Sequence, residues 1–159
     1  MRRLLLVLVL LATIATRWAE AGLAKVVPPS PSPGSHASHV PKLARKVVAY
    51  ARDQIGVSYS WGGTSPRTGF DCSGLVYAAY RSIGRKIPRS SWDQRRAGRP
   101  IRFARLRPGD LVFTEGGGHV QLVVSTRAAI SAPQTGERVR YVPLAQLRPA
   151  FAGARRLLK

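Results

Sequence analysis

The sequence has little cysteine, few acidic residues and no long apolar run. Its 159 residues include one cysteine, Cys72, so an intrachain disulfide is excluded. Seven Asp and Glu stand against 26 Lys and Arg. The longest apolar stretch, residues 4–15, is about a dozen residues, shorter than the ~20 that a membrane-spanning helix needs. No repeat is detectable, and the length suits one domain with short extensions.

The first residues have the three parts of an export signal. Arg2 and Arg3 give a positive start, the apolar run follows, and Ala19-Glu20-Ala21 supplies the small residues of a cleavage site. We therefore expect a secretory signal peptide over residues 1–21 and an extracytoplasmic location. A retained membrane anchor is the alternative, although the short run predicts no stable membrane span.

Residues 22–41 are rich in Pro and Ser and show no apolar period, which is typical of a flexible linker. Two of the three histidines, His36 and His39, lie in this linker. Without further ligands nearby they predict no metal site. Residues 42–159 are then the folded domain, and nothing in their sequence indicates a cofactor.

The net charge is +19, and residues 42–159 carry +16 of it, from 22 Lys and Arg and six Asp and Glu. Such a charge attracts polyanions over long distances. Phosphate-rich wall polymers, anionic lipid headgroups and free nucleic acid are the candidates, with a merely solvated surface as the alternative. No nucleic-acid-binding motif is recognisable, so nucleic acid is not an expected partner.

Apolar residues recur at helical spacing in the first half of the domain. Leu43, Val47, Val48 and Ala51 predict a helix ending near Gly56. Leu75, Val76, Ala79, Tyr80 and Ile83 predict a second helix that Gly84 terminates.

The second half has short apolar runs separated by turn residues. Ser91 and Gln94, three residues apart, predict a capping box at the start of a short helix. Residues 111–113 predict a strand. Residues 119–131 predict two strands around a tight connection, and residues 138–142 predict another. Helices followed by antiparallel strands indicate an α+β fold.

Cys72 lies at the start of the second predicted helix. Asp71 is a favoured N-cap residue, which puts Cys72 in the first turn. The N–H groups and the helix dipole there favour thiolate over thiol, and thiolate is the nucleophile. A buried structural cysteine is the alternative.

His119 is the only histidine of the domain and therefore the only candidate base. A hairpin centred on Ser125 would place Ser131 directly opposite His119 on the same side of the sheet. Ser131 would then orient the imidazole, and Gln134 is a second candidate for that role. A purely structural histidine is the alternative.

Six ordered segments carry a family resemblance. They are Tyr59-x-Trp61-Gly62-Gly63, Phe70-Asp71-Cys72-Ser73-Gly74-Leu75-Val76, Pro88-Arg89-Ser90-Ser91-x-x-Gln94, Leu106-x-Pro108-Gly109-Asp110-Leu111-Val112-Phe113, His119-Val120 and Ala132-Pro133-x-Thr135-Gly136. Together they resemble the NlpC family of papain-like cell-wall cysteine peptidases. The resemblance implies a papain-like fold in which N-terminal helices pack on a C-terminal antiparallel sheet.

The resemblance also implies hydrolysis of peptidoglycan stem peptides, commonly between γ-D-glutamate and a diamino acid. By similarity, Cys72 attacks the carbonyl carbon and His119 carries the proton. Tyr59 and the backbone N–H of Cys72 would hold the oxyanion, and Asp71 with Ser73 would hold the polar end of the substrate. A plain N-cap is an equal alternative for Asp71.

Two residues depart from the family pattern. Ser131 stands where His is usual, and Gln121 stands where Gly is common and could narrow the cleft. The expected protein is thus a monomeric, wall-associated peptidase whose basic surface could bind anionic wall polymers. A catalytically silent peptidoglycan-binding module with the same fold is the main alternative, and an amidase or acyltransferase is a further one.

Overall fold

The computed structural model describes residues 41–159 of the chain. The predicted signal peptide and all of the predicted linker except Pro41 lie outside the described residues. None of the helices in the described part is long and apolar enough to cross a membrane.

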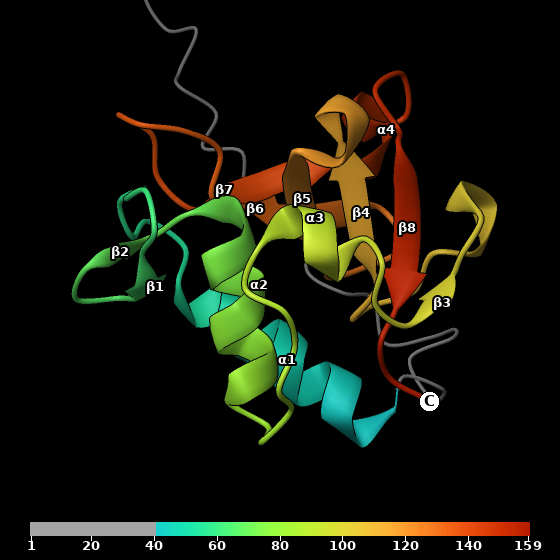
Figure 1. Cartoon of the computed structure of the whole chain (residues 1–159), viewed down its shortest axis with the longest axis horizontal. Helices are drawn as coiled ribbons and strands as arrows, with labels where there is room; N and C mark the ends of the chain where they lie inside the picture. Colours follow the sequence, from blue (N-terminus) through green and yellow to red (C-terminus); the bar gives the residue numbers. More distant parts are fainter. Residues whose placement is uncertain (1–40) are drawn as a thin grey trace, which may run out of the picture. The chain divides into compact units, whose positions relative to one another are not determined.

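Two helices, α1 (Lys42–Asp53) and α2 (Cys72–Arg81), lie against one face of a large sheet (Figure 1). On α1, Ala44, Val47, Val48 and Ala51 are buried. Leu43, which the spacing also assigned to the apolar face, is instead 47% exposed because it lies at the edge of this buried stripe, in the first turn of the helix. The helix ends at Asp53, and Gly56 adopts a φ of +90° three residues later.

The sheet has six strands in the order β3-β8-β4-β5-β6-β7, and every neighbouring pair is antiparallel. The strands are β3 (Arg99–Pro100), β4 (Leu111–Thr114), β5 (His119–Val123), β6 (Ala128–Ser131), β7 (Arg140–Pro143) and β8 (Gly153–Arg156). The predicted α+β fold is confirmed, with the helices first and the sheet later in the chain.

Smaller elements lie between these helices and strands along the chain. They are β1 (Thr64–Ser65), β2 (Gly69–Phe70), α3 (Ser91–Gln94), η2 (Phe103–Arg105), η3 (Glu115–Gly117) and α4 (Leu144–Leu147). The β1–β2 hairpin leads directly into Asp71 and α2, and η3 leads into β5. The two chain segments that carry Cys72 and His119 therefore both enter the fold from short turns.

Both faces of the sheet are buried. Val120 and Leu122 on β5 pack with Leu111 and Phe113 against the two helices. Val123, on the other face of β5, packs with a second cluster that includes Phe103 and Phe151. Successive strand residues face opposite sides, so β4 is buried throughout and β5 is buried from Val120 onward, with the polar Gln121 and Thr114 among the buried residues.

The β5–β6 hairpin is centred one residue later than the sequence suggested. Leu122 pairs with Ile130 and Val123 with Ala129, so the centre is residue 126 rather than Ser125. The constant sum of partner numbers is therefore larger by two, which moves partners along the strand but leaves each side chain on its predicted face. Ser131 lies diagonal to His119 rather than directly opposite it.

The cap of α3 is also displaced by one residue. Ser90, not Ser91, is the N-cap, and its hydroxyl accepts a hydrogen bond from the Asp93 N–H at 3.2 Å. Ser91 and Gln94, which sequence suggested as the capping box, are both buried. The Gln94 side chain donates from Nε2 to the Ser73 and Pro88 carbonyls, so it ties α3 to α2 instead of capping its own helix.

Candidate active site

Cys72 is the first residue of α2, where the backbone turns from extended to helical. Asp71 is the N-cap, with φ −90° and ψ 176°, and its Oδ1 accepts from the Gly74 N–H at 2.6 Å. The N–H of Cys72, as a first-turn donor, is not used within the helix. The thiol is partly buried and lies against β5, where the backbone N–H of Val120 donates toward the sulfur.

Burial raises the pKa of the Cys72 thiol above its ordinary value, and the nearby Asp71 carboxylate adds to this rise. The Val120 N–H and the Ser73 N–H and hydroxyl act in the opposite direction without reversing the shift. The helix start was expected to favour thiolate. In the folded chain, loss of water around the sulfur raises the pKa overall, so the resting group is a neutral thiol.

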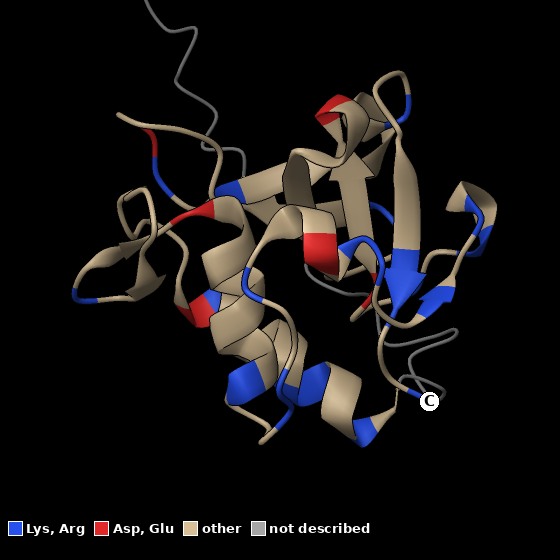
Figure 2. Cartoon of the chain, viewed as in Figure 1, with Lys and Arg blue, Asp and Glu red and all other residues tan. Residues whose placement is uncertain are grey.

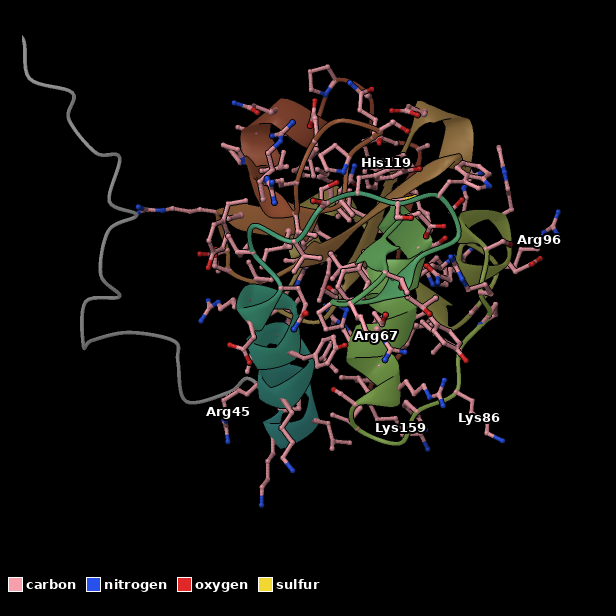
Figure 3. All side chains as sticks on the ribbon, turned by 90° about the vertical axis from the view of Figure 1, so that its left-hand side faces the viewer. Arg45, Arg67, Lys86, Arg96, His119 and Lys159 are labelled. Carbon is pink, nitrogen blue, oxygen red and sulfur yellow. The ribbon has the colours of Figure 1, made fainter. Side chains whose placement is uncertain are left out.

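His119, the first residue of β5, contacts Ser131 at the end of β6. Its Nε2 lies 2.9 Å from the Ser131 Oγ, and Ser131 is 2% exposed. Burial lowers the pKa of the imidazole; Glu115 raises it in part, and Arg140 lowers it further. The imidazole is therefore neutral near pH 7. Figure 3 shows His119 at the edge of the sheet layer, away from the outer ends of α1 and α2.

The Cys72 thiol contacts the backbone of the residue that follows His119. Val120, whose N–H points to the sulfur, directly follows His119. Ser131 occupies Nε2, which leaves Nδ1 as the ring nitrogen that can serve the thiol. Among residues 41–159 no hydrogen bond joins the sulfur to the ring directly, which is common in unliganded sites.

Asp71 is surrounded by donors. Its Oδ1 accepts from the Gly74 N–H, the Ser73 hydroxyl at 3.2 Å and Arg89 Nη1 at 3.0 Å. Its Oδ2 accepts from the Gly62 N–H at 2.9 Å and Arg89 Nη2 at 2.6 Å. Burial by itself raises the pKa of Asp71, but the bonds from Arg89, Gly74 and Gly62 and the Arg89 charge lower it overall.

Arg89 lies in one of the six ordered sequence segments, and in the folded chain it contacts Asp71 and Ser73. Its guanidinium bridges both Asp71 oxygens and donates to the Ser73 hydroxyl at 2.8 Å. Eighteen residues separate Arg89 from Asp71, so no local spacing could reveal this pair. The only signal was an arginine in an ordered motif.

Tyr59 lies beside the start of α2 because its backbone bridges to Phe70, two residues before Cys72. Burial raises the pKa of its hydroxyl; the Cys72 sulfur, ionised at the high pH where a tyrosine titrates, and the Asp71 carboxylate raise it further, against an opposing effect of Arg89. A hydroxyl with a raised pKa stays protonated and can donate. Within the described chain it has no protein hydrogen-bond partner, so it is free to donate to a ligand.

Two further residues lie elsewhere than sequence suggested. The Gln134 Nε2 donates to Glu137 Oε1 at 3.3 Å, so this side chain contacts its own exposed loop and not His119. Gln121 is 3% exposed and donates to the Thr114 hydroxyl at 3.1 Å. It is therefore part of the buried sheet and does not narrow an open cleft.

Metal ligands do not gather in the described part of the chain. Over residues 41–159, no three His, Cys, Asp or Glu side chains lie together in a way that could hold an ion.

A Cys at the start of a helix, packed on an antiparallel sheet whose strand begins with His, defines a papain-like α+β domain. The NlpC/P60 family model matches residues 56–154. The chain belongs to the NlpC/P60 family, which confirms the resemblance seen in the sequence.

Curated relatives include murein DD-endopeptidase MepH of Escherichia coli, 39% identical over 134 residues, which cover 78% of this chain and 49% of the relative. Peptidoglycan endopeptidase RipB of Mycobacterium tuberculosis is 39% identical over 127 residues, covering 68% of this chain and 53% of RipB. The chain thus spans about half the length of the curated relatives it matches.

Two solved structures show the same fold. An NlpC/P60 family protein from Bacillus cereus has a TM-score of 0.68 at 35% identity, covering 73% of this chain and 40% of that chain. The structure of peptidoglycan hydrolase RipB from M. tuberculosis has a TM-score of 0.67 at 33% identity, covering 79% of this chain and 73% of that chain.

Proposed function

We propose that this protein is an extracytoplasmic cysteine endopeptidase that hydrolyses peptidoglycan stem peptides. The observation that carries the proposal is the 2.9 Å contact between His119 Nε2 and Ser131 Oγ, beside a thiol at the start of α2. The matched relatives named as peptidoglycan endopeptidases support the substrate class. Export depends on the predicted signal peptide over residues 1–21.

The reaction begins from a neutral thiol and a neutral imidazole. With its hydrogen on Nε2, donated to Ser131 Oγ, the His119 ring accepts the thiol proton at Nδ1 while Cys72 Sγ attacks the scissile carbonyl carbon. The S–C bond forms and the carbonyl π electrons move to oxygen. The imidazolium then protonates the leaving amine as the C–N bond breaks, which leaves a thioester. Water activated by His119 hydrolyses that thioester and restores the thiol.

The developing oxyanion needs donors that are already in place. The first-turn N–H of Cys72 and the protonated hydroxyl of Tyr59 are the two groups that fit, since neither has a protein acceptor in the described chain. Loss of one such donor typically lowers kcat by about 10²–10³-fold. Ser131 contributes by holding the ring, and because it is neutral it stabilises the imidazolium less than a carboxylate does.

We place the cut at the bond between γ-D-glutamate and the diamino acid of the stem. The name of the E. coli relative points to a second bond, the D,D cross-link between stems. Digestion of cross-linked and of uncross-linked peptidoglycan, with mass spectrometry of the products, separates the two. Cleavage within uncross-linked stems supports the first bond, and release of monomers from dimers alone supports the second.

A silent peptidoglycan-binding module is the second candidate, because the third group is neutral and burial raises the thiol pKa. The test compares the reduced wild type with Cys72→Ala on purified walls. New stem fragments from the wild type alone support the peptidase. If neither protein yields fragments while both sediment with the walls, the binding module is the correct reading.

A further inference from the structure

A groove of about 460 Å³ lies between α3, the segment that follows it, β3 and β8. This volume is within the range of ligand-binding sites. Its main side chains are Trp92, Arg95, Arg96, Arg102, Phe151 and Arg155. It lies outside the catalytic constellation, and the proposed chemistry uses none of these residues.

The groove is strongly basic. Its lining includes four arginines and, within the described chain, no Asp or Glu. Figure 2 shows Lys and Arg gathered where the segment after α3, β3 and the end of β8 meet. Phosphate groups match this lining because guanidinium presents paired N–H donors to their oxygens.

Two of the arginines are fixed by the backbone. Arg95 donates to the Gly116 carbonyl at 2.9 Å and to the Ala152 carbonyl at 2.8 Å, and Arg155 donates from Nε to the Arg95 carbonyl. These bonds are to neutral acceptors, so both positive charges remain uncompensated. They give the groove a rigid cationic wall before any ligand arrives.

The other two arginines are available to a ligand. The Arg96 side chain is 81% exposed, and its ion pair with Asp93 is long, at 3.6 Å. Arg102 is exposed and has no ion pair within residues 41–159. Figure 3 shows Arg96 at the periphery of the molecule.

An aromatic side chain connects the groove to the catalytic loop. Trp92 is 53% exposed, and its Cζ2 lies 3.7 Å from where a Cβ on Gly118 would be. The neighbouring Ser91 hydroxyl donates to the Gly118 carbonyl at 2.9 Å. Gly118 directly precedes His119, so a polymer bound in the groove would pass the loop that carries the proposed base.

We infer that this groove binds a phosphate-bearing sugar or polyol polymer of the cell wall. The arginines take the phosphates, and Trp92 offers an apolar surface to the carbon atoms between them. The choice of a wall polymer over nucleic acid rests on the proposed function, since such a polymer shares the wall with the peptide substrate. The basic surface expected from sequence thus has a defined centre.

The test measures binding of poly(glycerol phosphate) of defined length to the Cys72→Ala protein, which removes the proposed nucleophile. Arg96→Glu/Arg102→Glu is compared with Lys46→Glu/Lys86→Glu, an equal charge change on exposed residues outside the groove. We expect the groove variant to bind at least about tenfold more weakly, with a salt slope shallower by about two, one for each lost phosphate contact. Trp92→Ala should also weaken binding.

Equal losses in the two double variants would show that binding is diffuse and would overturn the inference. Tighter groove binding of a single-stranded DNA with the same number of phosphates would overturn the wall polymer as the ligand. Stem-peptide hydrolysis by the wild type is measured separately. If hydrolysis fails while the groove variant alone loses polymer binding, the peptidase proposal fails and the groove stands.

Discussion

Nε2 of His119 and Oγ of Ser131 lie 2.9 Å apart although the two residues are diagonal, not opposite, across β5 and β6. The serine hydroxyl reaches the ring from the neighbouring strand and is almost fully buried. A buried neutral partner fixes the orientation of the ring but supplies no charge to the imidazolium. Two substitutions at Ser131 separate these effects.

Ser131→Ala should lower kcat about tenfold with little change in KM, because the ring loses its orienting contact. Ser131→Asp should instead raise the pKa of His119, so the acid limb of the kcat/KM profile moves to higher pH. Stem-peptide hydrolysis across pH measures both. Thr126→Ala, an exposed change in the same hairpin, is the control. An unchanged kcat in Ser131→Ala would mean that the contact does not assist the reaction.

The protonation of Cys72 can be measured without substrate. Its raised pKa predicts that iodoacetamide alkylation accelerates only as pH rises above the range of a free cysteine, near 8.5. Because Cys72 is the single cysteine, Cys72→Ala gives a zero background. A fast, pH-independent alkylation from pH 5 upward would instead indicate a preformed thiolate.

Arg89→Ala should destabilise the fold by about 1–2 kcal/mol. This is less than the ~3–5 kcal/mol for breaking a fully buried pair, because Arg89 is 37% exposed. Asp71 has a lowered pKa, so its contribution to stability is present above its unfolded pKa and is lost as pH falls through its folded pKa.

The difference in urea stability between wild type and Arg89→Ala should therefore be largest near pH 7 and shrink below about pH 4. Arg89→Lys keeps the charge but cannot bridge both oxygens, and should give an intermediate loss. Arg67→Ala, an exposed arginine in the β1–β2 turn, should leave stability within about 0.5 kcal/mol. A difference that is constant from pH 3 to pH 7 would contradict the role of the Asp71 charge.

The donors around Asp71 predict that the enzyme does not require a free amine on its substrate. Both carboxylate oxygens and the Ser73 hydroxyl are already bonded to Arg89, Gly62 and Gly74. Stem peptides with a free and with an acetylated N-terminal L-Ala should thus have kcat/KM values within about threefold, below ~1 kcal/mol. A strong preference for the free amine would show that substrate displaces Arg89.

Sequence reasoning recovered the elements that local pattern determines. The helix start at Cys72 followed from the Asp71 cap, and the β4 and β5 runs followed from their apolar residues. Fold class and family were confirmed because several ordered segments point the same way. The shared side of His119 and Ser131 followed from the two-residue period of a strand, which survives a register change of two.

What sequence missed depended on contacts between distant segments. The Arg89–Asp71 pair joins residues that only the folded chain brings together. The thiol pKa follows from burial, which no local pattern of charges and caps reveals. The α3 cap was misplaced by one residue because Ser90 and Ser91 are both acceptable N-caps, and only packing buried the second.

The position of β8 bears on the order in which the molecule can be completed. Residues 153–156 lie between β3 and β4 in the sheet. Both strands come earlier in the chain, and β4 begins more than forty residues before β8. A ribosome releases β3 and β4 first, and each then has an open edge that only β8 can pair. Until that strand is synthesised, β4, β5, β6 and β7 form a four-stranded sheet with β4 at one edge, and β3 has no partner strand. Synthesis of β8 is therefore the step that brings β3 into the sheet and completes the lining of the groove.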